Sequence, residues 1–459
     1  MNNLNIIILA AGFGKRMNSN IPKALIKTRK KEMLGHILDT ALELNPNKII
    51  IVYGYKKDLV KDYVNTNYSD IKNIHFAHQE IVDGTASAIK CTLEFINPTQ
   101  DCTNIIINGD CPLIRKETLQ DFVVQHEDLH SDVSVLSMEL DNPKSYGRII
   151  KSNDAAHKLE KITEFKDCNF IQRSIREVNT GIYAVSSKFL NFSIPKVQNK
   201  NVKKEYYLTD IIEIGVKHNK NVHVYKILNS EEAIGPNQPQ ELLETNKILL
   251  KRKLEKLNES GVIFDDINTC YLDEEVIIEK NVHIGPNVTI KGKSIIKEET
   301  FIEGNAYIIN SKIGKNNHIK YSVRVEESEI KDYCALGPFL QIRPNSVIED
   351  KVKLGNFVEI KASHIKKSSK VNHLSYVGNT NIGTNTNIGA GTITCNYDGV
   401  NKHQTNIGDN VFIGSNSILI APINIGNDSY TGAGTVTNKD IPNKTLVITR
   451  AKRVDKDLK

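Results

Sequence analysis

An aliphatic side chain recurs at every sixth position through most of the C-terminal half of this 459-residue sequence. A period of six is neither helical nor the alternation of a plain strand. Hexapeptide repeats are typical of a parallel β-helix, in which each repeat forms one short strand and one turn, and three repeats close a triangular coil. The in-phase residues are Ile278, Ile284, Ile290, Ile296, Ile302, Ile308, Leu336, Ile342, Ile348, Leu354, Ile360, Ile407, Ile413, Leu419, Ile425, Thr431 and Thr437.

The positions that flank each aliphatic residue support the same fold. Small residues or valines follow four places later, for example Val288 and Ser417, which predicts a stacked interior of apolar and small side chains. Glycines such as Gly285 and Gly355 come directly after the aliphatic residue, where tight packing or an unusual backbone angle favours glycine. A β-sandwich with chance spacing is the alternative, and so many in-phase repeats argue against it. One polar loop, residues 394–406, interrupts the period, and long loops that leave a solenoid often carry function.

Composition excludes several classes of function. A net charge of +6 over 60 basic and 54 acidic residues is mild, so nucleic-acid binding is not indicated. The seven cysteines are scattered and never form a CxxC pair, which suits a reducing cytosol better than a disulfide framework or a zinc site. The apolar run at residues 6–11 lacks a basic lead, so it is a poor signal peptide, and no run approaches membrane-spanning length. We expect a cytoplasmic protein that binds no membrane.

The N-terminal half alternates strand-like and helix-like segments from residue 4 to about residue 225. Such alternation predicts a mostly parallel sheet covered on both faces, with ligands beyond the carboxyl ends of its strands. The fold class is therefore α/β plus all-β: a doubly wound, Rossmann-like domain at 1–235, a linker helix at 236–260 and a left-handed parallel β-helix of hexapeptide repeats at 261–459. The assigned segments are 6–9, 32–44, 49–53, 56–64, 74–78, 85–95 and 105–107.

The first loop after a strand, residues 10–17, reads AAGFGKRM. Gly12 and Gly14 permit backbone N–H groups to approach an anion, and Arg16 and Lys23 supply cations for a polyphosphate. The loop lacks both the GxGxxG pattern of dinucleotide folds and the GxxxxGK[ST] pattern of P-loops. Considered alone, the loop is better explained as a simple β-to-α turn.

Asp110 follows the strand at residues 105–107 and should lie at the same edge of the sheet. A carboxylate that faces a polyphosphate pocket is a usual seat for Mg²⁺, which prefers one or two protein oxygens plus substrate phosphates. The pattern does not distinguish Mg²⁺ from Mn²⁺. As a lone residue before a proline, Asp110 would more often be a turn former.

Several motifs in the N-terminal half occur in one characteristic order. Residues 4–240 resemble the sugar-1-phosphate nucleotidylyltransferases, and the full set resembles the uridylyltransferase half of the bifunctional GlmU family. The motifs are LAAGFGKRM at 9–17, Pro22-Lys23, QEIVDGT at 79–85, Gly109-Asp110, YGR at 146–148, EFK at 164–166, NTG at 179–181, EYYLTD at 205–210 and GPN at 235–237.

The resemblance implies a role for each matched position. Leu9, Ala10, Ala11 and Gly12 would contact nucleotide and phosphates, and Gln79, Gly84 and Thr85 would surround the uracil. Arg16 and Lys23 would grip the triphosphate of UTP. Gly147, Glu164, Asn179 and Asn237 would hold the acetylated sugar phosphate, and Asp110 with Asn237 would hold Mg²⁺. Asn108 and Lys15 depart from the family pattern beside these positions, which affects the expected nucleotide affinity more than the reaction.

Large polar residues interrupt the hexapeptide pattern more often than we expect in a repeat with a purely structural role. The strings NHLSYVG at 372–378 and GAGTITCNYDG at 389–399 resemble the hexapeptide acyltransferases and match the acetyltransferase half of the same family. Acetyl transfer to a sugar amine requires a base with a pKa near neutrality, and imidazole is the natural choice. The family pattern assigns that base to His373. A lone histidine would more often be a structural surface residue.

The same resemblance covers residues 262–450 and implies the remaining acetyl-site residues and a homotrimer with sites shared between neighbouring β-helices. Direct transfer is implied, and an acetyl-cysteine intermediate on Cys395 is the alternative. The short tail after Arg450 leaves contacts at the CoA end open. Arg343 and Lys361 would bind the sugar phosphate, Tyr376 and Asn387 the sugar, Asn396 and Tyr397 would lie near the reacting centre, and Ala390, Ser415, Ala433 and Arg450 would line the acetyl-CoA site.

The resemblance implies one bifunctional enzyme. Acetyl-CoA and glucosamine 1-phosphate would give N-acetylglucosamine 1-phosphate, which with UTP and Mg²⁺ would give UDP-N-acetylglucosamine for cell-wall (peptidoglycan) and lipopolysaccharide precursors. Two alternatives remain: a monofunctional nucleotidylyltransferase with a structural, trimerising β-helix, and a scaffold subunit without chemistry. A scaffold would have no reason to keep both residue sets, and a monofunctional enzyme would keep only the first.

Overall fold

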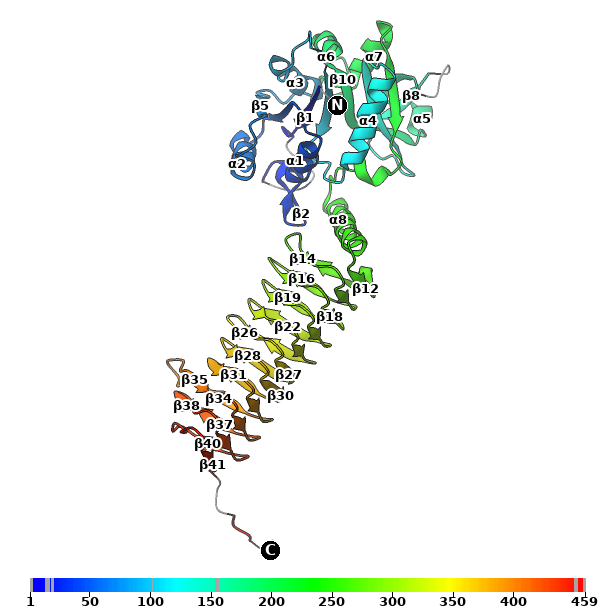
Figure 1. The fold of residues 1–459 in the computed structure, drawn as a ribbon. Coiled ribbons are helices and arrows are strands. Elements are labelled where there is room, and N and C mark those ends of the chain that lie inside the picture. The colour runs from blue at the N-terminus through cyan, green and yellow to red at the C-terminus, as the bar shows by residue number, and fades with distance from the viewer. Residues whose placement is uncertain are drawn as a thin grey trace. The chain divides into compact units, whose positions relative to one another are not determined.

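The computed structural model describes residues 3–12, 17, 20–100, 102–152, 157–449 and 453–456 (Figure 1). The chain forms two compact units, residues 1–249 and 250–459. The division falls inside helix α8 (Pro239–Glu259), between the boundaries at 235 and 260 that we expected from sequence. No helix in the described ranges is both long and apolar enough to cross a membrane.

A nine-stranded mixed sheet forms the centre of the first unit, in the order β11-β7-β10-β6-β1-β4-β5, and β8 pairs with β10 and β9. Neighbours among β6, β1, β4 and β5 are parallel, as predicted, whereas β10 runs antiparallel to both β6 and β7. The strands are β1 (Leu4–Leu9), β4 (Lys48–Tyr53), β5 (Ile74–His78), β6 (Thr103–Asn108), β7 (Val133–Glu139), β8 (Arg148–Lys151), β9 (Leu159–Thr163), β10 (Glu177–Ser186) and β11 (Val222–Lys226), with a separate hairpin of β2 (Lys27–Thr28) and β3 (Lys31–Glu32).

Helices cover both faces of this sheet, which confirms the doubly wound prediction. Alternation within β1 sends Ile6 and Ile8 into one apolar cluster and Ile7 into the other. Helices α1 (Met33–Glu43), α2 (Lys57–Asn67) and α4 (Lys116–Asp128) pack on the first face, and α3 (Thr85–Lys90), α6 (Ser187–Ser193) and α7 (Asp210–Lys217) on the second. The segment expected at 85–95 is divided into α3 and the 3-10 turn η3 (Leu93–Phe95). Short elements complete the unit: α5 (Phe170–Arg173), η2 (Lys23–Leu25), η4 (Phe165–Asp167), η5 (Ile194–Lys196) and η6 (Ser230–Ala233).

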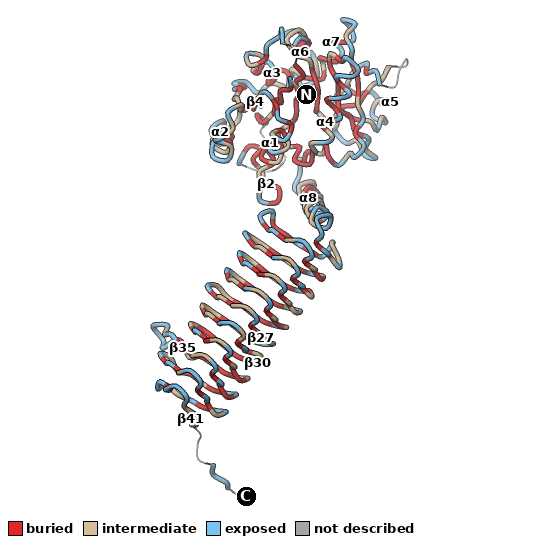
Figure 2. Tube along the Cα trace, viewed as in Figure 1, coloured by how far each residue is buried: buried red, intermediate tan, exposed pale blue. Residues whose placement is uncertain are grey.

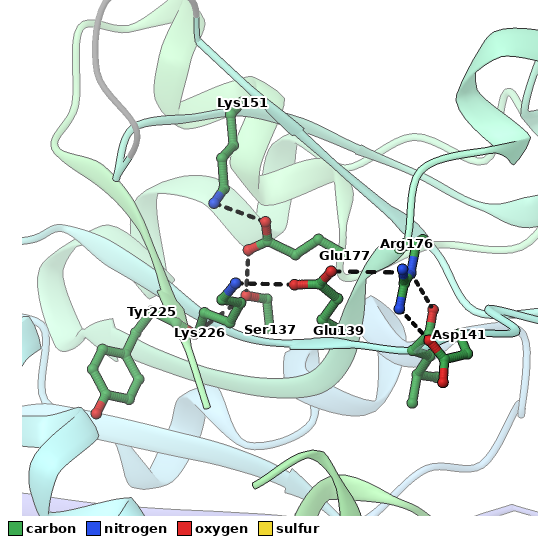
Figure 3. Close-up of polar contacts among 9 residues, drawn as sticks. Ser137, Glu139, Asp141, Lys151, Arg176, Glu177, Tyr225 and Lys226 are labelled. Carbon is green, nitrogen blue, oxygen red and sulfur yellow. Dashed lines mark hydrogen bonds and ion pairs between the residues drawn. The ribbon is translucent and has the colours of Figure 1, made fainter. Parts of the chain in front are cut away.

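Charged side chains connect four strands at one end of the sheet (Figure 3). Glu177 of β10 accepts from Ser137 of β7 at 2.7 Å and pairs with Lys151 of β8 at 2.7 Å. Glu139 of β7 pairs with Lys226 of β11 at 3.0 Å. Because these pairs cross from strand to strand, they favour one register for β10, the strand that carries Asn179.

The second unit is a β-helix built from three parallel sheets, here called sheets I, II and III. From β12 to β37, each strand pairs with the strand three places later in the sequence, so three strands make one coil; at the C-terminal end β39 pairs with β41. This architecture confirms the left-handed hexapeptide β-helix predicted from the period of six.

The strands of the three sheets are two to four residues long. Sheet I holds β12 (Ile263–Phe264), β15 (His283–Ile284), β18 (Phe301–Ile302), β21 (His318–Ile319), β24 (Ala335–Leu336), β27 (Lys353–Asn356), β30 (Lys370–His373), β33 (Asn387–Ile388), β36 (Phe412–Ile413), β39 (Tyr430–Thr431) and β41 (Leu446–Val447). Sheet II holds β13 (Tyr271–Leu272), β16 (Thr289–Lys291), β19 (Tyr307–Ile309), β22 (Val323–Glu326), β25 (Leu340–Ile342), β28 (Val358–Lys361), β31 (Tyr376–Gly378), β34 (Ile393–Cys395), β37 (Ile418–Ile420) and β40 (Val436–Thr437). Sheet III holds β14 (Ile277–Ile278), β17 (Ile295–Ile296), β20 (Lys312–Ile313), β23 (Glu329–Ile330), β26 (Val347–Ile348), β29 (His364–Ile365), β32 (Thr380–Ile382), β35 (Thr405–Ile407) and β38 (Ile423–Ile425).

The repeating aliphatic residues form the buried core of the coil. Figure 2 shows buried residues recurring along every coil. All the in-phase residues predicted from sequence are buried except Thr437, which is half-buried near the last coil. The small residues four places later, such as Val288 and Ser417, are buried as well. Truncating one of the fully buried isoleucines to alanine would cost about 2–5 kcal/mol, because the neighbouring coils cannot collapse into the space.

The corners of the coil explain the glycines and asparagines of the repeat. A Cβ on Gly355 would lie 1.8 Å from the carbonyl oxygen of Asn372 in the next coil, so close packing excludes any side chain there. Asparagines such as Asn281 and Asn287 adopt the left-handed backbone at other corners (φ 59° and 57°), which asparagine tolerates better than most residues. One coil differs: Asn381 contacts Asn406, 25 residues later, whereas Asn406 contacts Asn424, 18 residues later. The longer coil contains the predicted loop at 394–406.

The C-terminal part of α8 covers the first coil. Leu254 is buried in the apolar core of the β-helix. Lys253 Nζ donates to the carbonyl oxygens of Asp273 at 2.8 Å, Glu274 at 2.5 Å and Val276 at 3.2 Å. Through these contacts, α8 and the turn η7 (Ile267–Thr269) cover the first coil.

A buried histidine should make the first unit sensitive to acid. His126 of α4 is 3% exposed, its Nδ1 lies 2.9 Å from Ser134 Oγ, and burial and then His223 lower its pKa from 6.5 to about 4, against a smaller opposing effect of Asp132. As pH falls below 6.5, His126 binds a proton in the unfolded chain but stays neutral in the folded protein. The stability of the folded unit is therefore highest above pH 6.5 and decreases on acidification.

We expect the free energy of unfolding of this unit to fall by about 2 kcal/mol between pH 7.5 and pH 5.0 through His126. Urea titrations, monitored by hydrogen exchange of peptides from β7, would measure this free energy at each pH. His126→Gln should remove most of that pH dependence, and an unchanged slope in this variant would contradict the assignment.

Candidate active sites

The first candidate site lies where three parallel strands of the first unit end. Leu9 pairs with Asn108 on one side and Val52 on the other, and the N–H of Gly109 donates to the carbonyl of Leu9 at 2.8 Å. Ala10 and Ala11 are buried behind this edge, and the open space around Gly12 leaves its backbone accessible. The predicted phosphate loop and Asp110 therefore begin at adjacent strand ends.

Lys23, Asp110 and Asn237 meet at this edge although they are far apart in sequence. Lys23 Nζ forms an ion pair with Asp110 and donates to Asn237 Oδ1 at 2.8 Å. Asn237 is held in place by its own contacts: its N–H donates to Glu241 Oε2 at 2.7 Å and its Nδ2 to the carbonyl of Gly235 at 2.9 Å. Two oxygen ligands thus converge on one cationic position.

A cavity of about 230 Å³ opens beside this cluster. Its lining includes Glu164, whose carboxyl pKa is raised by burial, with the Lys203 ammonium opposing part of that rise. Asn108, one of the two departures from the family pattern, also lines it, and its amide packs against Gly181. Five of the predicted site residues line this cavity: Leu9, Thr85, Gly147, Glu164 and Asn179.

A β-bulge places Asn179 in the cavity wall. The pairing of β10 with β7 shifts register between Asn179 and Ile182, with Gly181 in the left-handed region at φ 81°. The Asn179 side chain is fixed from both ends: Nδ2 donates to Tyr183 Oη at 2.8 Å and Oδ1 accepts from the Gly181 N–H at 2.9 Å. A regular strand would direct this side chain differently.

Gln79, Gly84 and Thr85 form one connected group. Gln79 Nε2 donates to the carbonyl of Gly84 at 3.0 Å and to Ser87 Oγ at 2.8 Å. Gly84 has φ 146° and a Cβ there would lie 2.3 Å from the Tyr206 carbonyl oxygen, so glycine is required. Thr85 Oγ1 accepts from the Leu208 N–H at 2.9 Å, which links the group to the EYYLTD motif.

Two predicted site residues, Arg16 and Arg450, lie outside the described residues, as do Gly14 and Lys15. Their roles remain predictions.

The second candidate site lies on the β-helix around His373, at the corner between sheets I and II. His373 is exposed, and its Nδ1 lies 3.0 Å from Oδ1 of Asn356, the residue paired with it in the coil above. An amide oxygen only accepts hydrogen bonds, so Nδ1 carries the proton. The second ring nitrogen, Nε2, is therefore left as the basic atom.

Cations gather on the outward face of sheet II. Arg343 and Lys361 follow Ile342 and Ile360, which pair across β25 and β28, and Arg343 binds Glu359 at 2.7 Å. The ammonium of Lys402, from the loop at 394–406, and then Arg343 lower the pKa of Lys361. Like charges held together in this way favour an anionic ligand.

Tyr376 and Asn396 converge next to these cations. Lys361 pairs with Gly378 in the next coil, where no side chain fills the column. A Cβ on Gly378 would lie 2.6 Å from Tyr376 Oη and 2.8 Å from Asn396 Nδ2. Because Gly378 carries no side chain, the Tyr376 hydroxyl and the Asn396 amide both approach its backbone, and the next residue, Tyr397, is exposed.

The predicted acetyl-CoA residues form a column that begins at His373. Backbone hydrogen bonds join the corners of successive coils. The Gly391 N–H donates to the His373 carbonyl at 3.2 Å, and the Asn416 N–H donates to the Ala390 carbonyl at 2.7 Å. In the next coil the Gly434 N–H donates to the Ser415 carbonyl at 2.8 Å. Ala433 lies in the last of these corners. Ala390, Ser415 and Ala433 all carry small side chains.

Asn387 does not join this group within one chain. It lies on sheet I, paired with Lys370 and Phe412, and its neighbour Ile388 points inward. The sugar-binding candidates Arg343, Lys361 and Tyr376 belong to sheet II.

Two residues at these sites were missed from sequence. Asn356 lies 17 residues before His373, so the coil period could have found it. Lys402 lies in the loop that breaks the period, and no periodic signal relates it to Lys361.

Two family models match the chain. One described as "Nucleotidyl transferase" matches residues 5–235, and one described as "Bacterial transferase hexapeptide (six repeats)" matches residues 404–439.

Curated relatives named "Bifunctional protein GlmU" match over nearly the whole chain. The protein from Geotalea uraniireducens is 39% identical over 100% of this chain and 98% of its own length. The protein from Carboxydothermus hydrogenoformans is 38% identical over 98% of each. The protein from Thermosipho melanesiensis is 40% identical over 99% of this chain and 96% of its own length.

The tautomer of His373 can be measured directly. Nitrogen-15 NMR of the neutral imidazole should show a protonated Nδ1 and an unprotonated Nε2. His283, His318 and His364 offer an internal control, because each approaches a carboxylate through Nε2 at 2.6–2.7 Å and should show the opposite tautomer. Asn356→Leu should abolish the preference of His373 alone; the same spectrum in this variant would mean that Asn356 does not set it.

Proposed function

Because the chain belongs to the family of bifunctional GlmU proteins, we propose how its two units divide the two reactions of that family. The protein is a bifunctional transferase that makes UDP-N-acetylglucosamine. The β-helix transfers acetyl from acetyl-CoA to glucosamine 1-phosphate, and the α/β unit transfers uridylyl from UTP to N-acetylglucosamine 1-phosphate with release of pyrophosphate. The observation that carries this division is the presence of two separate polar clusters, one around Asp110 and one around His373.

In the uridylyl reaction, a phosphate oxygen of the sugar phosphate attacks the α-phosphorus of UTP in line, and pyrophosphate leaves as the new bond forms. No covalent enzyme intermediate is needed, so the protein contributes positioning and charge. Lys23, with Arg16, would neutralise the triphosphate. Glu164, Asn179 and Gly147 line the cavity that would hold the acetylated sugar, with Gln79, Gly84 and Thr85 around the base.

The Asp110–Asn237 pair suits Mg²⁺. Among the described residues, no three His, Cys, Asp or Glu side chains gather that could hold a metal by themselves. Mg²⁺ prefers one or two protein oxygens, with substrate phosphates as its remaining ligands. In this structure the Lys23 ammonium lies between the oxygens of Asp110 and Asn237 that would bind the metal. Bound there, Mg²⁺ would supply positive charge against the phosphate oxygens; Mn²⁺ would serve the same ligands.

In the acetyl reaction, His373 Nε2 would remove a proton from the amino group of glucosamine 1-phosphate. The amine nitrogen then attacks the thioester carbonyl, the carbon–sulfur bond breaks, and the CoA thiolate leaves and takes up a proton. Arg343 and Lys361 would hold the sugar phosphate, Tyr376 and Asn396 would flank the sugar, and the column Ala390, Ser415 and Ala433 would hold the pantetheine. A base next to the substrate supports direct transfer over a relay through Cys395.

We propose a homotrimer in which neighbouring β-helices share the acetyl sites. Asn387 lies on a different sheet from Arg343, Lys361 and Tyr376, so one chain does not assemble the whole predicted set. Apolar side chains on successive coils of one corner remain largely exposed: Tyr321 at 45%, Phe339 at 50%, Phe357 at 56% and Leu374 at 65%. Exposed aromatic side chains in a row beside His373 suit contact with a second copy of the chain.

A reducing compartment, the cytoplasm, fits the cysteines. All seven lie within the described residues, and none forms a disulfide.

The division of labour predicts separable losses. His373→Ala should lower acetyl transfer at least about a hundredfold and spare uridyl transfer from supplied N-acetylglucosamine 1-phosphate, because general-base catalysis typically contributes that much. Asp110→Ala should do the reverse. Free CoA thiol and pyrophosphate would be followed separately in purified protein with Mg²⁺.

Loss of both activities in either folded variant would refute the two-site model. If the unaltered protein released pyrophosphate only from supplied N-acetylglucosamine 1-phosphate, with no CoA thiol, the β-helix would be a structural module and the monofunctional alternative would hold.

Shared sites predict complementation between inactive chains. Co-expressed His373→Ala and Asn387→Ala chains should regain about a quarter of the acetyl transfer of the unaltered protein, because random mixing leaves that share of sites with both residues intact. Each variant alone should stay near the background rate. No recovery in mixed trimers, verified by mass, would place both residues of one site on the same chain.

A further inference from the structure

The loop at 394–406 keeps a defined shape with little apolar support. Among residues 396–402, all of them described, only Asn396 is buried. Tyr397 is 61% exposed and Val400 82% exposed. Loops without buried side chains open easily, so polar contacts must hold this one.

The Asp398 carboxylate is the hub of those contacts. Its Oδ1 accepts from the backbone N–H groups of Val400 at 2.8 Å and Asn401 at 2.7 Å, and its Oδ2 binds His403 Nε2 at 2.6 Å. His403 first, and then the two N–H groups, hold the pKa of Asp398 well below its usual value, so the carboxylate is ionised throughout the neutral range.

The contacts of Asp398 close the loop into a narrow hairpin. The Asp398 N–H donates to the Asn401 carbonyl at 3.2 Å, the His403 N–H donates to the Asn396 carbonyl at 2.8 Å, and Tyr397 and Lys402 form an antiparallel bridge between them. Asn396 fixes the base of the hairpin on the β-helix, because its Nδ2 donates to Asn379 Oδ1 at 2.7 Å. The backbone of Lys402 is therefore determined by the turn that Asp398 organises.

The position of Lys402 is electrostatically unfavourable without a ligand. Its ammonium lies next to that of Lys361 and lowers the pKa of Lys361, which Arg343 also lowers. Free lysine side chains on a surface would move apart, since like charges repel and a long side chain gains freedom in solvent. A rigid hairpin that keeps Lys402 in place pre-arranges three cations for one dianion.

We propose that Asp398 is a positioning residue for the acetyl reaction: it does not touch the substrate, but it holds the hairpin that presents Lys402 to the phosphate of glucosamine 1-phosphate. The inference rests on the proposed acetyl site. Asp398 should therefore act on the affinity for the sugar phosphate through Lys402, and only weakly on the chemical step at His373.

The test is steady-state acetyl transfer in the full-length protein. Asp398→Ala should raise the KM for glucosamine 1-phosphate about tenfold, the factor expected for one lost charge-assisted contact, and leave kcat within about threefold. Asp398→Asn keeps an oxygen for the two N–H groups and should recover part of the affinity. Asp440→Ala is the matched control, because Asp440 is another exposed carboxylate that accepts a backbone N–H, from Asn424 at 2.7 Å, and it should leave KM unchanged.

A double variant separates positioning from a general structural role. If Asp398 acts through Lys402, then Asp398→Ala added to Lys402→Ala should raise KM less than twofold further. Multiplied effects of the two changes, or a fall in kcat with KM unchanged, would overturn the proposal.

Uridyl transfer in each preparation reports how much of the first unit is folded, and it should not change. An unaltered protein that released no CoA thiol would refute the proposed acetyl function itself, which is a different outcome from variants that match the unaltered enzyme.

Discussion

The hydrogen-bonded step between coils is the constraint on which the second unit depends. Each strand pairs in parallel with the strand one coil later, and the interior is too narrow for anything but aliphatic and small side chains. Because the inward positions are fixed, every outward position on a coil lies directly above one on the next. Catalytic groups can therefore be assembled by vertical stacking, as Asn356 stacks on His373 and Lys361 on Gly378.

The first unit brings its site residues together with a different geometry. Its ligands come from distant places in the sequence, since Lys23 and Asp110 are 87 residues apart and Lys23 and Asn237 are 214 apart. Parallel strands bring them together because their carboxyl ends share one edge. The antiparallel strand β10 adds Asn179 through a bulge. One chain thus carries an α/β sheet that gathers residues at an edge and a solenoid that gathers them along a column.

The features that could be predicted from the sequence are those that leave a local or periodic pattern. Ile342 and its in-phase partners, the loop at 394–406 and the alternating N-terminal elements could all be read from the sequence, because each leaves a local pattern. The antiparallel direction of β10 and the bulge at Gly181 leave no such pattern, since they depend on partners in β6 and β7. Asn356 was within reach of a 17-residue offset, whereas Lys402 approaches Lys361 only through a hairpin whose path depends on side-chain contacts of Asp398. The grouping of Asn237 with Asp110 came from resemblance, not from spacing.

The one long coil has an evolutionary consequence. The residues between Cys395 and Thr405 make this coil longer, yet β32 and β35 pair in the regular register, because the loop leaves and re-enters at a corner. The length of a loop at a corner can therefore change without a change in the register of the strands. A β-helix of this kind can acquire, enlarge or lose a substrate-recognition loop in a single insertion or deletion event, while its fold is inherited unchanged.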